Sequence, residues 1–168
     1  MPNYRRFYAG NVWFFTVATQ TRKPLLTSLG ARFCLRMAIG NCRERYPFQI
    51  EGWVLLPDHL HCIWHLPDSD LDYSRRWSLI KRKFTQQFRQ TSNFMPPFWQ
   101  KRFWAHAIFD ERDYASHLDY THYNPVKHGY VKAPGEWPWT SFHRSVALGL
   151  YPSNWGENVS FYDDIGNE

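Results

Sequence analysis

The stretch DHLHCIWHL, residues 58–66, decides the fold of this 168-residue chain. Apolar side chains take alternate positions in it, at Leu60, Cys62, Trp64 and Leu66. The positions between them hold His59, His61, Ile63 and His65. Because successive side chains of a strand point to opposite faces, we expect a strand with one face in the core and imidazoles on the other.

The segments around this strand have their own periodicity. Residues 12–19, 48–56 and 103–109 are rich in β-formers and read as further strands. Ser28 is positioned to cap a helix whose apolar stripe comprises Leu29, Phe33, Met37, Ala38 and Cys42. A second helix, capped by Asp72 or Ser74, has an apolar stripe at Trp77, Ile80, Phe84 and Phe88, and a third begins after Asp110.

This order of elements, β-α-β-β-α-β-α, predicts a fold class. It is the split βαβ of the α+β ferredoxin-like sandwich, in which helices pack on an antiparallel sheet. The histidine strand would lie inside that sheet, with His59 and His61 turned toward its open side or toward the last helix. We expect one domain over residues 1–168, with a core at about 4–130 and a C-terminal extension at about 131–168.

Composition sets limits on the class of protein. A hydrophobic share of 43% and a charged share of 21% exclude a mainly disordered chain. The net charge of +5 suits a polyanionic partner without proving one. Three cysteines make no disulfide framework, and the longest apolar run, VWFFTVA, is far too short for a membrane span. A cytoplasmic location is the expectation.

Two imidazoles on one strand face can converge on a divalent ion, although His-x-His also arises by chance. The segment HLDYTHYNPVKHG, residues 117–129, supplies further groups. Tyr120 and Asn124 are four residues apart and so lie one turn apart on one helix face, and Pro125 is expected to end that helix. Taken singly, the asparagine reads equally well as a helix-stop residue and the tyrosine as a core residue.

A basic stripe follows the second helix. Arg75, Arg82 and Arg89 are seven residues apart, with Arg76 and Lys83 beside them. A DNA-binding face and a solvated face that keeps the protein soluble explain this stripe equally well.

Five motifs occur along the chain in a fixed order. They are YRR at 4–6, LPDHLHCIW at 56–64, FWQKRFWAHAIFD at 98–110, DYTHYNPVKHG at 119–129 and WPWTSFHR at 137–144. In this order and spacing the chain resembles the single-tyrosine HUH transposases associated with repetitive extragenic palindromes (REP). The resemblance extends over residues 4–155.

The resemblance implies roles for particular residues. His59 and His61 match the histidine pair that binds Mg²⁺ or Mn²⁺, and Asn124 matches the position of a third, amide, ligand. Tyr120 matches the nucleophile that attacks single-stranded DNA and leaves a 5'-phosphotyrosine. Tyr123 matches no catalytic position of the family, so we expect it to be a packing residue.

The resemblance also implies a hairpin DNA partner with a short flanking tag, bound by a protein that we expect to be monomeric. The groups expected on DNA are Tyr4, Arg5, Arg6, Arg75, Arg82, Arg89, Lys101 and Arg102. The extension would pack over the site or against the hairpin. By residue type alone, His65, His106 and His143 are further ligand candidates, although ordinary hydrogen-bonded histidines explain them better.

Two other functions stay open from the sequence. A metal-dependent phosphodiesterase would use His59 and His61 without a covalent intermediate. A non-enzymatic nucleic-acid-binding module would stack bases on exposed rings, but the rings of the histidine strand are expected on the core side.

Overall fold

A four-stranded antiparallel sheet lies at the centre of the molecule. The computed structural model describes residues 10–158, so Tyr4, Arg5 and Arg6 lie outside the described residues. The strands are β1 (Val12–Ala18), β2 (Gln49–Leu55), β3 (His59–His65) and β4 (Trp104–Ala107). Their order across the sheet is β2-β3-β1-β4, and each neighbouring pair is antiparallel.

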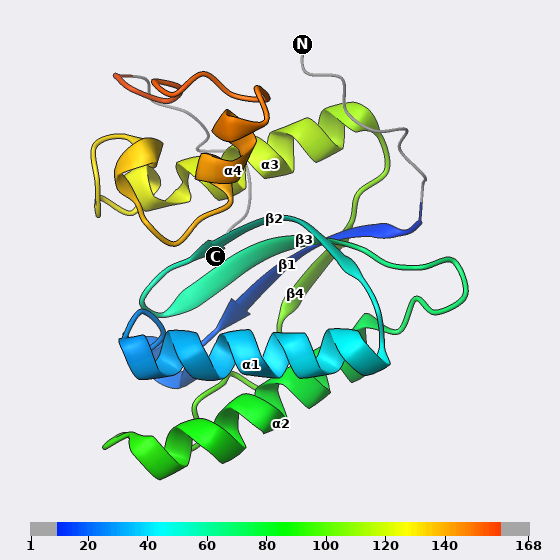
Figure 1. The fold of residues 1–168 in the computed structure, drawn as a ribbon, viewed down its shortest axis with the longest axis vertical. Coiled ribbons are helices and arrows are strands. Elements are labelled where there is room, and N and C mark those ends of the chain that lie inside the picture. The colour runs from blue at the N-terminus through cyan, green and yellow to red at the C-terminus, as the bar shows by residue number, and fades with distance from the viewer. Residues whose placement is uncertain (1–9, 159–168) are drawn as a thin grey trace.

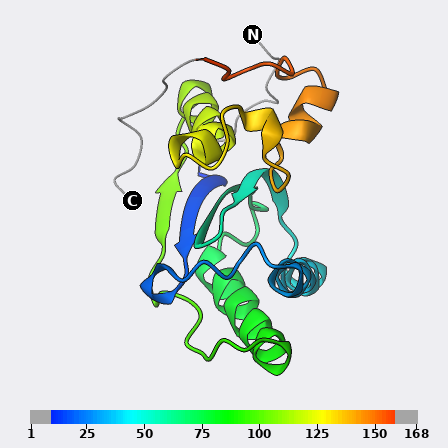
Figure 2. The same cartoon turned by 90° about the vertical axis from the view of Figure 1, so that its left-hand side faces the viewer.

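Helices cover both faces of this sheet (Figure 1, Figure 2). One face carries α1 (Leu29–Arg45) and α2 (Tyr73–Thr91); the other carries α3 (Glu111–Lys127) and the short α4 (Phe142–Ala147). Two 3-10 turns, η1 (Gln20–Arg22) and η2 (Pro134–Glu136), complete the elements. The predicted ferredoxin-like order is confirmed. Within the described residues, no helix is long and apolar enough to cross a lipid bilayer.

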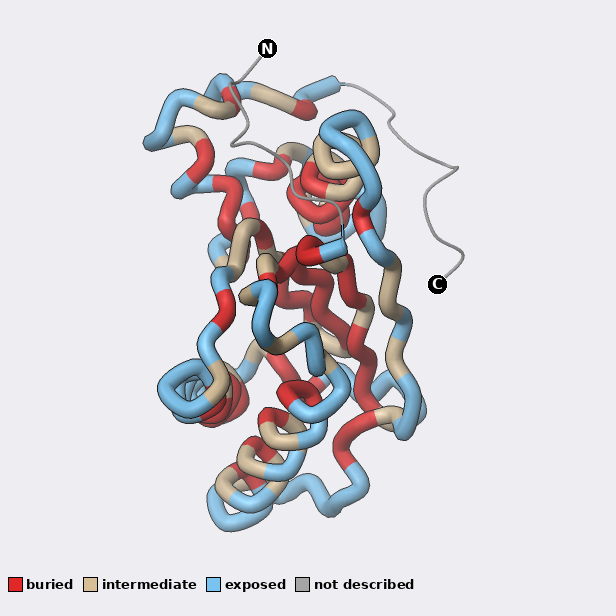
Figure 3. Tube along the Cα trace, turned by 90° about the vertical axis from the view of Figure 1, so that its right-hand side faces the viewer, coloured by how far each residue is buried: buried red, intermediate tan, exposed pale blue. Residues whose placement is uncertain are grey.

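The alternation of β3 is confirmed by the two cores. Leu60, Cys62 and Trp64 belong to the larger core, which α1 and α2 cover. Ile63 belongs to a second core beneath α3, and His59 and His61 lie on that same side. Both faces of β3 are therefore buried, and Figure 3 shows the strands at the centre of the molecule as mostly buried.

The predicted apolar stripe of α1 is wrong in part. The cap is as expected, since the Ser28 side chain accepts a hydrogen bond from the backbone N–H of Ala31. The buried residues, however, are Ala31, Cys34, Leu35, Ala38 and Cys42. Leu29, Phe33 and Met37 are exposed. The helix has apolar residues on two faces, and the smaller side chains pack because α2 approaches closely on their side.

Arg76 does not belong to the solvent face of α2. It is 1% exposed, and its guanidinium donates to the carbonyls of Tyr46, Pro47 and Asp70 and to the Asp70 carboxylate. A buried guanidinium is tolerated only when its donors are satisfied, as they are here. Arg76 therefore fastens the start of α2 to the segment that precedes β2.

Helix α3 also continues beyond its expected end. Pro125 lies inside the last turn, where only one backbone hydrogen bond is lost. The helix ends at Lys127, and Gly129, with a φ of 75°, turns the chain while the Tyr130 N–H donates to the Pro125 carbonyl.

The approach of α3 to the sheet depends on Gly52 of β2. A β-carbon built there would lie 2.6 Å from Cδ1 of Leu118, a buried side chain of α3. Gly52→Ala should therefore lower the free energy of unfolding by about 1–3 kcal/mol through overpacking. Gly40→Ala on α1, where a β-carbon meets nothing within 4 Å, should instead raise it by up to about 1 kcal/mol. Urea unfolding of both variants checks this, and an equal loss in the two would contradict it.

Candidate active site

The candidate site lies between β3 and α3. Strand β3 turns His59 and His61 toward α3, and their ring centroids lie 4.9 Å apart. The Tyr120 ring comes from α3 and lies 5.2 Å from His61, centroid to centroid. The structure thus brings together the predicted histidine pair and the predicted nucleophile, which are about sixty residues apart in sequence.

Both imidazoles are held through the same ring nitrogen. Nδ1 of His59 lies 2.7 Å from the Asp58 carboxylate, and Nδ1 of His61 lies 2.8 Å from Thr16 Oγ1. A carboxylate only accepts, so Nδ1 of His59 carries the proton and Nε2 carries the lone pair. Partners of this kind fix the tautomer and orientation of metal-binding histidines. Nε2 is therefore the nitrogen that each ring would present to a metal.

Asp58 is held ionised by its surroundings. Burial raises its pKa, but the hydrogen bond from His59 and the charge and hydrogen bond of Arg22 outweigh that effect, so the pKa lies below its usual range. Nε of Arg22 donates to Asp58 Oδ2 at 2.8 Å. Arg22 and Thr21 both have a φ of 54°, in the left-handed region that L side chains rarely adopt. Turn η1 thus places the Arg22 guanidinium against the carboxylate that orients His59.

Asn124 lies on the same helix as Tyr120, one turn further on, and is fully buried. Within the described part of the chain, neither its amide oxygen nor its amide nitrogen has a hydrogen-bond partner. A buried amide left in this way costs about 1–3 kcal/mol. Such a group is suited to complete a site for a cation, and its oxygen is a hard ligand.

Tyr120 is 2% exposed, and its phenol oxygen accepts a hydrogen bond from Nζ of Lys127 at 3.2 Å. The ammonium also lies 4.8 Å from the Tyr120 ring centroid. Lys127 and the next residue, His128, are exposed, and the His128 ring lies 5.0 Å from that of His59. The surface that leads to the site is therefore positively charged and formed by the end of α3.

Four of these residues were not predicted from the sequence: Thr16, Arg22, Asp58 and Lys127. Asp58 could have been recognised, because it directly precedes His59 and acidic groups commonly orient metal-binding histidines. Lys127, seven residues after Tyr120, shares its helix face at two full turns. Thr16 and Arg22 carry no sequence signal, since strand register and a left-handed turn bring them into place.

Tyr123 lies among packing residues, as expected. It is 8% exposed, and its ring lies 6.4 Å from that of Trp155 in the C-terminal extension. The extension packs on α3 and β2 through Ser141, whose Oγ accepts from the Trp53 N–H and lies 2.9 Å from Nε2 of His122. It thus ties α3 to the edge strand β2.

Among the described residues, the arginines of α2 that were expected on DNA do not lie on the same face of the sheet as Tyr120. Arg75, Arg82 and Arg89 are exposed on α2, which covers the opposite face, and Lys101 and Arg102 are exposed just before β4. Arg75 pairs with Asp72 at 3.6 Å. Of the other candidate ligands, His106 is hydrogen-bonded to Asp113 and His143 to the Trp137 carbonyl, while Nδ1 of His65 lies 3.6 Å from the Glu51 carboxylate.

A groove lies on this basic surface. It is formed by α2 and the segment before β4, and its lining includes Lys81, Arg82, Arg89, Trp99 and Lys101. The Gln20 N–H donates to the Phe98 carbonyl and the Thr19 N–H to the Asp58 carbonyl, so η1 connects the groove wall to His59.

The fold and the site together are those of a single-tyrosine HUH transposase. A REP-associated tyrosine transposase of Escherichia coli K12 is 46% identical to the chain over 161 residues, which are 95% of this chain and 94% of the relative. A Haemophilus influenzae protein assigned provisionally to the same family is 43% identical, over 94% of this chain and 95% of the relative. The chain therefore belongs to the family of REP-associated tyrosine transposases.

Solved structures agree with this assignment. A REP-associated tyrosine transposase bound to a REP hairpin superposes with a TM-score of 0.80 at 46% identity, over 97% of this chain and 96% of that one. A Deinococcus radiodurans protein at 14% identity and a TM-score of 0.51 shares the fold, over 71% of this chain and 95% of that one. No protein-family model matches the chain.

The contact between α3 and the extension should be sensitive to acid. Burial, followed by the charges of Arg144 and His143, lowers the pKa of His122 from 6.5 to about 3. The unfolded chain then binds this proton below pH 6.5 while the folded chain does not, so stability falls as pH falls, by about 1.4 kcal/mol per pH unit at most. Urea unfolding at pH 7 and pH 5 should show a smaller loss for His122→Gln than for the wild type. An equal loss in both would contradict this account.

Proposed function

We propose that this chain cleaves and rejoins single-stranded DNA beside palindromic hairpins, with Tyr120 as the nucleophile. The observation that carries the proposal is the convergence of Tyr120 with His59 and His61, at 5.2 Å between the rings of Tyr120 and His61. Covalent catalysis by a tyrosine conserves the phosphodiester bond energy, so the strands can be rejoined without ATP.

His59, His61 and Asn124 would hold the divalent ion. The donor set fits such an ion, because Asp58 and Thr16 fix the imidazoles and the buried Asn124 amide has no other hydrogen-bond partner among residues 10–158. Two imidazoles with one amide oxygen suit Mn²⁺ better than Mg²⁺, since Mg²⁺ prefers oxygen ligands. When bound, the ion neutralises charge on the phosphate and orients it.

The covalent step exchanges one phosphate ester bond for another. The Tyr120 oxygen attacks phosphorus, and the bond from phosphorus to the 3' oxygen breaks. The tyrosine loses its proton to solvent, and the 3' oxygen gains one to become a hydroxyl. Nζ of Lys127, 3.2 Å from the phenol oxygen, stabilises the anionic oxygen during the attack and draws the phosphate toward the end of α3.

The groove beside α2 is the proposed path of the hairpin backbone. The transposase whose solved structure superposes at a TM-score of 0.80 was bound to a REP hairpin, which supports a hairpin partner for this chain too. Arg82, Arg89 and Lys101 would contact phosphates, Trp99 and the loop at 96–98 form the other wall, and Arg75 and Arg102 extend the surface. Tyr4, Arg5 and Arg6 remain proposed contacts to the flanking bases on the ground of the sequence alone.

We also infer that the chain works as a monomer of one domain in the cytoplasm. The chain pairs its own nucleophile with its own histidines, which is all that a single cleavage requires. All three cysteines are unoxidised and buried, as expected of a protein in a reducing compartment.

A denaturing gel tests the nucleophile. A labelled hairpin oligonucleotide with a single-stranded flank, incubated with Mn²⁺ and then boiled in detergent, should leave a protein–DNA adduct. Tyr120→Phe should remove the adduct and the cleavage while hairpin binding persists, because only the attacking oxygen is lost. Tyr123→Phe is the matched control and should keep both, since Tyr123 matches no catalytic position of the family. Cleavage by the Tyr120 variant would overturn the proposal, and cleavage without an adduct would favour a phosphodiesterase.

Salt dependence of binding tests the groove. Arg82→Ala with Arg89→Ala should weaken binding to every hairpin and lower the slope of log K against log salt by about 2, since each arginine would neutralise one phosphate. Arg36→Ala with Arg45→Ala removes the same charge from exposed positions of α1, outside the groove, and should leave the slope nearly unchanged. Equal effects of the two pairs would show that only net charge matters.

A further inference from the structure

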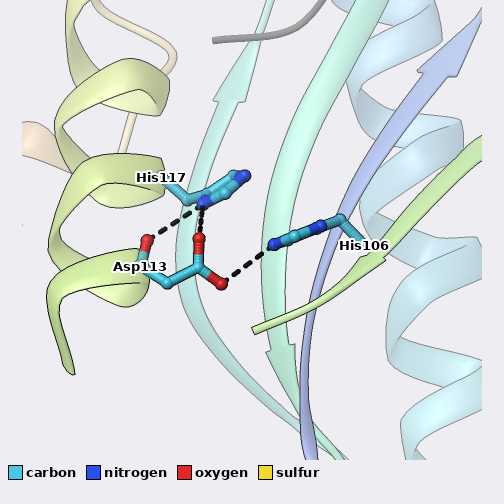
Figure 4. Close-up of side chains that lie close together, drawn as sticks. All are labelled: His106, Asp113 and His117. Atoms are coloured by element: carbon cyan, nitrogen blue, oxygen red, sulfur yellow. Dashed lines mark hydrogen bonds and ion pairs between the residues drawn. The ribbon is translucent and has the colours of Figure 1, made fainter. Parts of the chain in front are cut away.

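A second cluster of histidines lies where the first turn of α3 meets β4. It consists of His106 on β4 with Asp113 and His117 on α3 (Figure 4). Nε2 of His106 lies 2.9 Å from Asp113 Oδ2, and Nδ1 of His117 lies 3.0 Å from Asp113 Oδ1. The two imidazoles stack at 4.5 Å between centroids. Both rings thus aim a nitrogen at one carboxylate from the same side.

The surroundings of this cluster restrict its members. The Asp113 side chain is 9% exposed and that of His117 is 12% exposed. The Phe109 N–H donates to Asp113 Oδ2, and Nδ1 of His117 also lies 2.9 Å from the Asp113 carbonyl. Burial, opposed by Asp113, lowers the pKa of His117. The carboxylate is therefore oriented by a backbone donor, as metal-binding carboxylates are.

We propose that His106, Asp113 and His117 form a second metal site, separate from the His59 and His61 pair, for a divalent transition metal such as Zn²⁺. One ligand atom from each residue lies within 4.8 Å of the others. Ligands of a tetrahedral Zn²⁺, with bonds of about 2.0–2.2 Å, lie about 3.4 Å apart, which falls between the 2.9 Å and 3.0 Å nitrogen–oxygen distances of the cluster and its outer limit of 4.8 Å. On binding, each neutral ring carries its proton on the nitrogen that faces away from the ion. Three protein ligands leave one position for water.

The position of the cluster suggests what the ion would do. The Phe14 ring packs against His117 at 4.8 Å, against His61 at 5.4 Å and against Tyr120 at 6.1 Å, centroid to centroid. The cluster therefore lies one aromatic ring away from the active site. An ion held there would tie the edge strand β4 to the start of the helix that carries Tyr120, and so fix that helix relative to the sheet.

Calorimetric titration of the metal-stripped full chain with Zn²⁺ tests the site. His106→Ala should bind one equivalent fewer than the wild type, whatever the other histidine pair binds. His65→Ala is the matched control: its side chain is 30% exposed against 31% for His106, and it also faces a carboxylate, Glu51, at 3.6 Å. The His65–Glu51 pair lacks a second imidazole, so His65→Ala should leave the number of bound Zn²⁺ equivalents unchanged.

Asp113→Asn supplies an independent variant, because it preserves the shape of the carboxylate while removing its charge. It should lose the same equivalent, and Zn²⁺ should raise the melting temperature of the wild type more than that of either variant. The same number of equivalents and the same Kd in wild type, His106→Ala and Asp113→Asn would overturn the proposal and leave the cluster as a hydrogen-bonded clamp between β4 and α3.

Discussion

The packing of α3 across the second face of the sheet is the constraint on which the site depends. Strand β3 has side chains of the larger core on one face and the imidazoles of His59 and His61 on the other. Without a second layer of structure on that face, the two imidazoles would be exposed to water. Helix α3 covers them and brings Tyr120 and Asn124 with it. Gly52 allows the helix to approach, the Phe14 ring packs against both Tyr120 and His61, and the C-terminal extension ties the helix to β2. Site and second core are therefore one structure.

The sequence predicted the parts of this arrangement that follow from local periodicity. Alternation along β3 identified which side chains meet the helices and which carry chemistry, because a strand has only two faces. The four-residue spacing of Tyr120 and Asn124 placed both on one helix face for a similar reason. The caps at Ser28, Asp72 and Asp110 were also recognisable, since each side chain accepts from a backbone N–H three residues later.

Features set by tertiary contact could not be predicted in this way. Helix α1 offers apolar residues on two faces, and only the position of α2 decides that Cys34 and Leu35 are buried while Phe33 is exposed. The sequence predicts Arg76 as part of a basic surface, because the backbone carbonyls that bind its guanidinium come from a segment about thirty residues earlier in the chain. Arg82 was predicted to bind DNA, yet it lies on α2, on the opposite side of the sheet from Tyr120. Periodicity shows which residues share one face of a helix, but it does not show how the faces of two helices are placed relative to each other.

The central claim is that Tyr120 forms the covalent bond to DNA, and the site of the adduct tests it most directly. Cleavage after Arg112 and Lys127 releases a peptide, residues 113–127, that contains Tyr114, Tyr120 and Tyr123. Mass spectrometry of the denatured and nuclease-trimmed adduct can separate these tyrosines by fragmenting the peptide backbone between them. The account predicts a nucleotide on Tyr120. A nucleotide on Tyr123 or Tyr114, or on a residue outside α3, would contradict it.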